Sequence, residues 1–418
     1  MVAYIFSFID RQIMTLLVDP IKADLNINDT QFGLLHGLAF ALFYATMGLP
    51  IASLADRKSR PLIIAAGIAF WSFATAACGF AKSFLHLFIA RIGVGAGEAA
   101  LSPATYSLIS DLFPPHQLGR AIAVYSLGSF LGAGLAFLVG GSVVAFVDQA
   151  QTTVLLGHTF SGWQLTFFIV GIPGILLAAC VLALVKEPWD GDRVQSQEIS
   201  PTMLDVFKFL ILERSIFARH FIGFTLAAMS LYALLSWSAA FFMRCYDLTP
   251  GESGFRLGLI VTAFSGAGVL SCGWLMDQLQ RRNIAAPPFV TGVIGAFGTA
   301  VPVAALITEP SLDVATALMA MAFFFSTYAM PPSTAVMQVI APKNMRSRVS
   351  SIFLAVNALL GMGLSSALVG FGNDRLFEGQ YATGKSLAMV VALSALAAIP
   401  ILWSAVRPYA DRVASKTS

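Results

Sequence analysis

Four charged residues interrupt apolar stretches of the sequence: Asp10, Arg11, Arg91 and Glu98. Two are acids and two are bases, so their formal charges cancel. Arg91 and Glu98 are seven residues apart, which places them two turns apart on one face of a helix. A carboxylate can bind and release a proton, and a guanidinium can bind an anionic group through its fork of donors. The four residues are therefore candidates for proton coupling and for binding a charged head group.

The composition shows which solvent surrounds these residues. The chain has 418 residues, of which 57% are hydrophobic and 11% are charged, against about 25% charged residues in a typical soluble domain. The mean hydropathy is +0.78. So much apolar surface cannot be hidden inside a soluble fold, so much of it must face lipid. The formal net charge of +3 is too small to indicate a nucleic-acid partner.

Charges inside a membrane are costly, and this cost limits what the four residues can do. Each costs about 2.5–3.5 kcal/mol at the centre of a span on insertion scales. Four unpaired charges would cost about 10–14 kcal/mol, which is comparable to the whole stability of a protein, about 5–15 kcal/mol. They must therefore pair with one another or face water. A purely structural set of ion pairs is the competing interpretation.

Apolar segments long enough to cross a membrane divide the chain into two equal sets. About 20 residues are needed for one crossing. Twelve segments are predicted: 2–18, 31–54, 61–81, 84–111, 119–147, 163–186, 216–243, 256–276, 286–307, 312–340, 348–372 and 386–406. The one long polar stretch follows the sixth segment. The predicted organisation is an N-terminal six-helix bundle (1–186), a cytosolic linker (187–215) and a C-terminal six-helix bundle (216–418).

The distribution of Lys and Arg predicts the orientation. With the N-terminus inside, 17 of these residues fall in cytosolic turns and 6 on the outer side. This asymmetry is typical of polytopic membrane proteins. We therefore expect a multi-pass protein of the plasma (cell inner) membrane with both termini in the cytosol.

The ends of the second and eighth segments carry the same pattern of charges. Asp56, Arg57 and Arg60 follow the second segment, and Asp277 ends the eighth, followed by two arginines. Two parallel repeats of this kind place a substrate path at their interface. Each Asp could contact the positive N-terminus of a helix in the opposite half and hold the cytosolic side closed. The four residues are predicted to form a cytosolic gate, and a plain topology signal is the alternative.

The same residues carry a resemblance to a known superfamily. The turn Ala52–Arg60 and the run Arg91-Ile-Gly-Val-Gly-Ala-Gly-Glu98-Ala99 resemble signatures of the major facilitator superfamily. The pair Asp10-Arg11, together with Gly97-Glu98-Ala99, Asp111–Pro115 and Gly119–Tyr125, is most similar to the Spinster family of lysolipid- and sphingolipid-type transporters. Anion:cation symporters share the Asp-Arg and Gly-Glu-Ala motifs. Ser7-Phe8 stand where the Spinster family often has Asn-Tyr, and Ala52 stands where the superfamily signature usually has Gly.

The resemblance implies an all-α membrane protein with twelve transmembrane helices in two pseudo-symmetric six-helix bundles, the major facilitator fold. It also implies a secondary active transporter for an amphipathic, anionic lysolipid- or sphingolipid-like molecule. Further candidates for substrate contact are polar residues inside apolar segments: His36, Tyr232, Trp237, Ser326, Thr334, Gln338 and Asn357.

Three functional classes remain open. The first is a proton-coupled carrier of that amphipathic cargo by alternating access. The second is a symporter of small organic anions from the same superfamily. The third is a receptor or an enzyme built on this scaffold. The histidines are scattered and no CxxC pair exists, so neither an enzyme nor a metal site is expected. The expected partners are the cargo, protons and membrane lipids, with no cofactor, and the expected state is a monomer.

Overall fold

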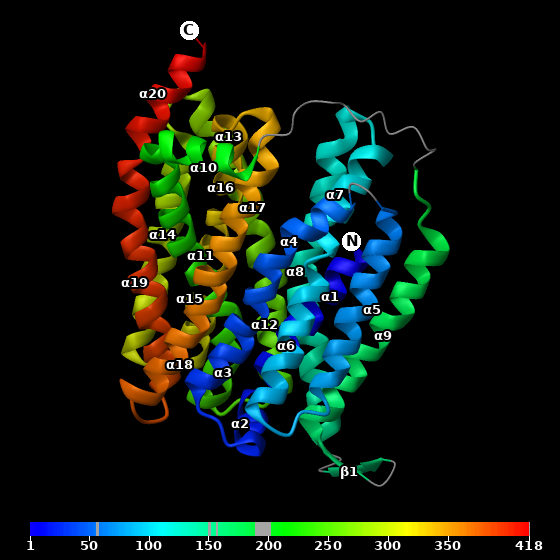
Figure 1. The fold of residues 1–418 in the computed structure, drawn as a ribbon. Helices are drawn as coiled ribbons and strands as arrows, with labels where there is room; N and C mark the ends of the chain where they lie inside the picture. Colours follow the sequence, from blue (N-terminus) through cyan, green and yellow to red (C-terminus); the bar gives the residue numbers. More distant parts are fainter. Residues whose placement is uncertain (56–57, 149–151, 156–157, 189–201, 418) are drawn as a thin grey trace.

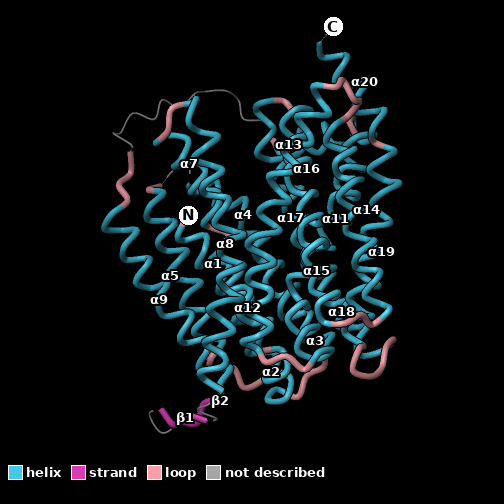
Figure 2. Tube along the Cα trace, turned by 180° about the vertical axis from the view of Figure 1, so that it is seen from behind, coloured by secondary structure: helices cyan, strands magenta, loops and turns pink. Residues whose placement is uncertain are grey.

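The computed structural model describes residues 1–418 except 56–57, 149–151, 156–157, 189–201 and 418. The described chain is almost entirely helical, and most of its helices run side by side in one direction (Figure 1). The helices α1–α9 form one group and α10–α20 form a second group beside it, as both views show (Figures 1 and 2).

The first group contains short helices as well as long ones. Its helical elements are α1 (Val2–Gln12), the 3₁₀ turn η1 (Ile13–Leu16), α2 (Val18–Leu25), α3 (Asp29–Gly33), the π-helical η2 (Leu34–Ala39), α4 (Phe40–Ala55), α5 (Arg60–Cys78), α6 (Phe84–Glu98), α7 (Leu101–Leu112), α8 (Pro115–Asp148) and α9 (Gly162–Leu184). The strands β1 (Thr152–Leu155) and β2 (His158–Ser161) pair antiparallel between α8 and α9, with Thr152 opposite Ser161.

The second group also combines long helices with short helical elements. Its elements are α10 (Met203–Leu212), α11 (Arg214–Tyr246), α12 (Pro250–Ile260), the π-helical η3 (Val261–Ser265), α13 (Gly266–Arg281), α14 (Pro287–Ala305), η4 (Leu306–Thr308), α15 (Leu312–Ser326), η5 (Thr327–Ala329), α16 (Met330–Ile340), η6 (Lys343–Met345), α17 (Arg346–Val356), the π-helical η7 (Asn357–Leu364), α18 (Ser365–Arg375), α19 (Ala382–Ser404) and α20 (Val406–Thr417).

The helix starts follow from local chemistry. Ser161 and Thr249 form capping boxes that satisfy free backbone N–H groups of α9 and α12. Prolines stand at the first or second position of α5, α12 and α14, where a missing N–H costs nothing.

Ten stretches of helix in the described residues are long and apolar enough to cross a membrane. They coincide with the third to twelfth predicted segments, from Arg60–Cys78 to Ala382–Ser415. The first two predicted segments are broken up in the structure. The first ends early, because α1 gives way to the tight turn η1 and then to the short helix α2. The second runs through α3, η2 and α4.

The hairpin β1–β2 and the helix α10 were not expected from the sequence. The hairpin β1–β2 projects from one end of the molecule, and α2 lies at that same end (Figure 2). We call this end the hairpin end. The opposite end, called the linker end, carries α20 and α10, which is a helix in the region predicted as a linker (Figure 1).

The two groups touch through close helix packing. Helix α3 packs on α18, η2 on η7, and α8 on α12. At Gly37 in η2 an added Cβ would lie 2.7 Å from the backbone oxygen of Met362, so only glycine fits this contact.

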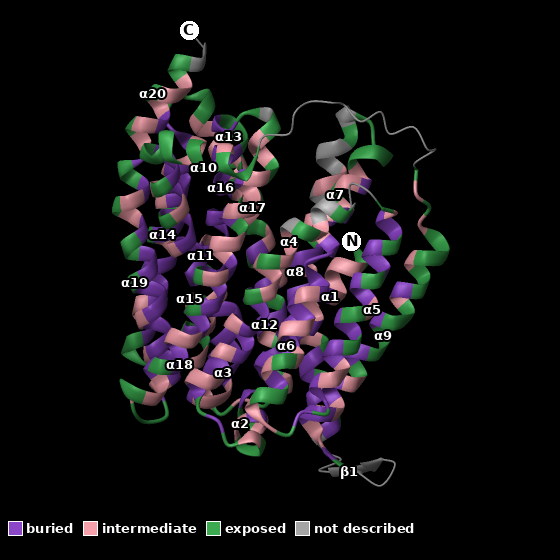
Figure 3. Cartoon of the chain, in the orientation of Figure 1, coloured by how far each residue is buried: buried purple, intermediate pink, exposed green. Residues whose placement is uncertain are grey.

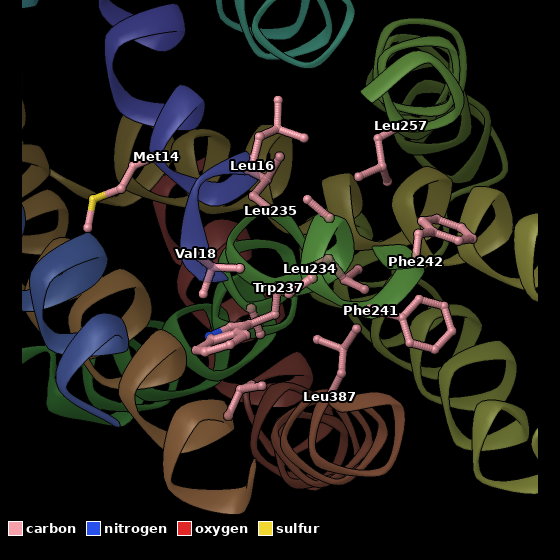
Figure 4. Packing of buried hydrophobic residues seen from close by; sticks show 14 of the residues in the cluster. Met14, Leu16, Val18, Leu234, Leu235, Trp237, Phe241, Phe242, Leu257 and Leu387 are labelled. Atoms are coloured by element: carbon pink, nitrogen blue, oxygen red, sulfur yellow. The ribbon is translucent and has the colours of Figure 1, made fainter. Parts of the chain in front are cut away.

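Buried residues fill the centre of both groups, whereas outward faces are exposed and apolar (Figure 3). The largest buried cluster joins the groups, since it contains Met14, Leu16 and Val18 from the first and Leu234, Trp237 and Leu387 from the second (Figure 4). The exposed large apolar side chains, such as Phe73, Phe146 and Leu270, are those expected to face lipid.

Candidate functional site

The centre of the candidate site is an ion pair between α1 and α6. The Arg11 Nη2 atom lies 2.6 Å from the Glu98 Oε2 atom. Both residues are buried, with 8% and 3% of their surface exposed. An ion pair removed from water in this way is stabilised only when its members stay together, because either charge alone would be uncompensated.

The other two charges of the predicted cluster lie on the same two helices. Arg91 is fully buried, and its Nη1 donates to the main-chain oxygen of Asp10 at 3.4 Å. Asp10 is also buried, with 1% exposed, and its carboxyl lies close to the side chains of Trp71 and Thr75. The structure therefore brings the four residues together. The paired members are Arg11 and Glu98, and Arg91 contacts the backbone of Asp10.

Several polar atoms of this cluster have no hydrogen-bond partner within the described residues. They are Oδ1 of Asp10, Nε of Arg11, Oε1 of Glu98, and Nε and Nη2 of Arg91. Buried polar atoms of this kind are uncommon and call for a functional or solvent explanation. Each of these atoms therefore keeps a donor or acceptor position that no described residue fills.

Aromatic rings surround the guanidinium of Arg11. Its Cζ atom lies 4.2 Å from the ring centre of Phe40, 4.8 Å from that of Phe8 and 5.6 Å from that of Tyr44. Tyr4 adds a stacked contact with Tyr125, with 4.7 Å between ring centres. We call the rings of Phe8, Phe40 and Tyr44 the aromatic wall. They hold the Arg11 guanidinium by cation–π attraction.

Three of the further candidates lie near the boundary between the groups. Asn357 donates to the hydroxyl of Tyr232 at 3.4 Å. His36 is buried, and its Nδ1 lies 3.1 Å from the Ser236 hydroxyl of the other group. The other ring nitrogen of His36 has no hydrogen-bond partner in the described part of the chain.

The remaining candidates either make buried contacts with the backbone or lie exposed on the surface. Trp237 is fully buried and donates to the backbone of Ser366 at 2.9 Å, which is a packing contact between α11 and α18. Ser326 is buried and donates to the backbone of its own helix. Thr334 and Gln338 are exposed on α16.

The predicted gate residues are only partly described. Asp56 and Arg57 lie outside the described residues. Arg60 is 2% exposed and is held by carboxylates of its own group: its Nη1 lies 2.5 Å from Asp111 Oδ2 and its Nη2 2.5 Å from Glu187 Oε1. Asp277 is exposed on α13, and no ion pair to it occurs among the described residues.

An ionic network at the hairpin end was missed by the sequence analysis. Arg244, at the end of α11, pairs with Asp19 of α2 and with Asp29 of α3, each at 2.6 Å. Lys22 also pairs with Asp29. The backbone N–H groups of Asp29 and Thr30 donate to Asp374 of α18 at 3.1 and 2.7 Å. We call these residues, Asp19, Lys22, Asp29, Arg244 and Asp374, the hairpin-end network.

The network connects the two groups electrostatically. Burial of the Asp29 carboxyl opposes ionisation, but hydrogen bonds and charges from Arg244 and Lys22 hold its pKa below the ordinary value of 3.8. Asn28 caps α3 and Asp29 is the first residue of that helix, so local helix-start chemistry accounts for both residues. No spacing rule links them to Arg244, which is 215 residues away.

The fold and the site together define a helical membrane carrier. The chain belongs to the major facilitator superfamily, whose family model matches residues 1–366. Within this superfamily, the chain is most like the Spinster transporters.

The solved structures include a bacterial homologue of the human lysosomal transporter Spinster in an inward-facing, unoccupied conformation. It shares 27% identity and a TM-score of 0.77 with this chain, and covers 99% of this chain and 95% of its own. Among curated proteins, an MFS-type efflux pump of Mycolicibacterium smegmatis is 28% identical over 96% of this chain and 90% of its own. Protein spinster of Drosophila melanogaster is 28% identical over 70% of this chain, and the match spans 47% of that protein.

Proposed function

We propose that this transporter carries an amphipathic, anionic, lysolipid- or sphingolipid-like molecule, coupled to protons, by alternating access between two bundles. The bundles are residues 1–186 and 216–418, joined by a cytosolic linker at 187–215. In this proposal the chain crosses the plasma membrane twelve times, acts as a monomer, and has its linker end and both termini in the cytosol.

The observation that carries the proposal is the buried pair of Arg11 and Glu98, 2.6 Å apart, inside an aromatic wall. While Glu98 is ionised, it occupies the Arg11 guanidinium, which then has little attraction for an anion. A proton on Glu98 removes that competitor, and the fork of Arg11 can bind a phosphate or carboxylate. Proton and anion then bind cooperatively, and each raises the affinity for the other by the same factor.

Further residues have supporting roles in this proposal. Arg91 and Asp10 complete the charged cluster, and Asp10 is the second acid that can carry the proton. Tyr232 and Asn357 offer polar contacts from the second group, and His36, Trp237, Ser326, Thr334 and Gln338 are kept as candidate contacts. Phe8, Phe40 and Tyr44 supply apolar surface beside Arg11 for the part of the cargo next to its head group.

A second candidate function is the transport of small organic anions. A probable L-galactonate transporter of Escherichia coli is 24% identical over 68% of this chain and 61% of its own. The same arginine would bind a sugar acid, but such a cargo has less apolar surface than an acyl chain to bury against the aromatic wall. The efflux pump from Mycolicibacterium favours export as the direction of transport.

The test is cargo affinity as a function of pH, measured on purified protein with a lysophospholipid and with galactonate. For the wild type we expect tighter binding of the lysophospholipid in acid, with a coupling of about 5- to 150-fold. Glu98→Gln should bind at least as tightly as the wild type in acid and lose the pH dependence. The exposed Glu378→Gln is the matched control and should behave as wild type.

Each contrary result has a definite meaning. Equal pH slopes for the wild type and Glu98→Gln would exclude Glu98 as the proton carrier, and a flat response in both would make the cluster a structural ion pair. Binding of galactonate without binding of the lysophospholipid would favour the second candidate function.

A further inference from the structure

The helix α10 (Met203–Leu212) is apolar on two opposite faces. One face packs against the second group, with Val206 fully buried and Phe209 and Leu210 beside the same cluster. Phe209 makes an edge contact with Phe217 of α11, with ring centres 5.5 Å apart. The second group of helices therefore covers this face of α10.

The other face has no protein partner in the described residues. Leu204 is 62% exposed, Phe207 48% and Ile211 63%, and the spacing of three and four residues puts them in one stripe. Met203 and Leu212 extend the stripe at both ends, with 37% and 80% exposed. A helix that is apolar nearly all round is stable only when both faces are covered.

Charged groups border this stripe in a definite pattern. The one acid of α10, Asp205, accepts from the backbone and hydroxyl of Thr202 at 2.9 and 2.6 Å in a capping box. These bonds hold the pKa of Asp205 below its usual value. Lys208 is exposed on the stripe side. The exposed Arg214 is the first residue of α11, and only Glu213 separates it from the end of α10.

The position of α10 connects it to the lipid-facing surface. Only Glu213 separates it from the membrane-spanning α11, and Arg412 of α20 pairs with Glu213 at 2.6 Å. The helix thus lies at the linker end, where a spanning helix emerges from the membrane (Figure 1). Apolar residues on α11 that face outward, such as Ile222 at 53% exposed, continue the same type of surface into the bilayer.

We infer that α10 is an interfacial helix whose partner is the leaflet at the linker end. Leu204, Phe207 and Ile211 lie in the boundary between head groups and acyl chains, and Lys208 and Arg214 bind the head groups of anionic lipids. Apolar burial and attraction between basic side chains and anionic lipids are the two contributions that hold such helices at a membrane surface. Lys208 reaches the head groups while its methylene chain follows the apolar stripe.

The test uses spin labels on full-length protein in lipid nanodiscs. The native cysteines at 78, 180, 245 and 272 are replaced by alanine, and single labels are placed at 207, 211 or 415. Collisions are measured with oxygen, which concentrates in the acyl region, and with a water-soluble nickel chelate. We expect labels at 207 and 211 to favour oxygen. The label at 415, on the exposed Ser415 of α20 at the same end, should favour the chelate.

The role of the basic residues is tested by lipid composition. Nanodiscs of phosphatidylcholine alone are compared with nanodiscs that also contain phosphatidylglycerol. Anionic lipid should deepen the label at 207, and Lys208→Gln with Arg214→Gln should abolish that difference. The expected change in the ratio of immersed to water-exposed helix is about 30-fold, since each basic side chain contributes about 1 kcal/mol and 1.4 kcal/mol is tenfold. Arg375→Gln at the hairpin end is the control and should leave the difference intact.

Three results would overturn the inference. A label at 207 that behaves as the one at 415 would place α10 in water. A label at 207 that neither reagent reaches would mean that protein, such as a second copy of the chain, covers the stripe. Equal immersion with and without phosphatidylglycerol would show that Lys208 and Arg214 do not bind anionic head groups.

Discussion

Arg244 and Asp29 join the two helical groups through a double contact. The Nη1 of Arg244 lies 2.6 Å from Oδ2 of Asp29, and its Nη2 lies 3.0 Å from the other carboxylate oxygen. Asp29 has little exposed surface, 3% of the residue, so the pair is largely removed from water. A carrier that alternates must break this contact when its hairpin end opens, so the pair is a natural place to change the balance between states.

We expect Arg244→Gln to shift the protein toward states open at the hairpin end. Loss of hydrogen bonds to a charged partner costs about 1.5–3 kcal/mol, or roughly 10- to 150-fold in the ratio of closed to open forms. Distances between spin labels placed on α3 and α18 across the hairpin end measure the shift. Arg375→Gln removes an exposed base from the same end and should leave the distances unchanged. Identical distributions for Arg244→Gln and the wild type would show that packing alone closes this end.

The same network predicts a dependence on pH. The pKa of Asp29 is lowered by Arg244 and Lys22 in the closed form, relative to 3.8 for a free carboxyl. An acid whose pKa is lower in the closed form stabilises that form at every pH above the pKa of the free carboxyl. This stabilisation is lost as the pH falls through the lowered pKa of the closed form. The closed fraction should therefore be constant from neutral pH down to about 4 and fall in stronger acid. Asp29→Asn should flatten that acid response, and a response that survives the substitution would have to come from another group.

Close packing at Gly37 gives a prediction independent of charge. A Cβ there would lie 2.7 Å from the backbone oxygen of Met362, which cannot move aside as a flexible side chain would. Gly37→Ala should lower the stability of the closed form by about 1–3 kcal/mol, as overpacking does. The matched control is Gly48→Ala in α4, where nothing lies within 4 Å of the added atom. That variant should gain up to about 1 kcal/mol from helix propensity. Thermal unfolding and label distances across the hairpin end measure both, and equal effects at the two positions would refute the packing argument.

The charged cluster could be located from the sequence because a charge inside an apolar segment has few explanations. The pairing itself is not in the sequence, since Arg11 and Glu98 are 87 residues apart. The spans were predicted where apolar runs were long, as in α9 and α19. They were imprecise at the first segment, where Pro20 and several charges allowed the break into η1 and α2. The hairpin-end network was missed because its members fall between the predicted segments, at or near helix ends, where an Asp is usually a cap and an Arg a topology signal.

The role of Arg60 can be separated from that of a gate. Its guanidinium is held by Asp111 and Glu187 and by the backbone oxygen of Ser107 at 2.9 Å, all within the first group. We expect Arg60→Gln to lower the unfolding temperature by loosening the junction of α5, α7 and the end of α9. Glu187→Gln should do the same to a smaller extent. Neither should alter distances between labels placed across the linker end, where the sequence predicted the gate. A change in those distances without a change in unfolding temperature would instead give Arg60 the gating role predicted from the sequence.

The geometry of the Arg11 guanidinium yields the last prediction. Arg11 forms a salt bridge with Glu98 and lies over the ring of Phe40. Both interactions depend on the planar shape of the guanidinium. Arg11→Lys keeps the positive charge but loses the fork and the stacking, so it should recover only part of the cargo binding. Arg11→Ala should lose binding, and it also leaves Glu98 buried without its partner, which destabilises the fold.

The double variant Arg11→Ala with Glu98→Gln separates these two effects. It removes the uncompensated charge, so its unfolding temperature should return toward that of the wild type while binding stays lost. Equilibrium binding and thermal unfolding are therefore measured on all three variants. If the double variant regained binding as well as stability, Arg11 would only neutralise Glu98, and the head group of the cargo would have to be bound by Arg91.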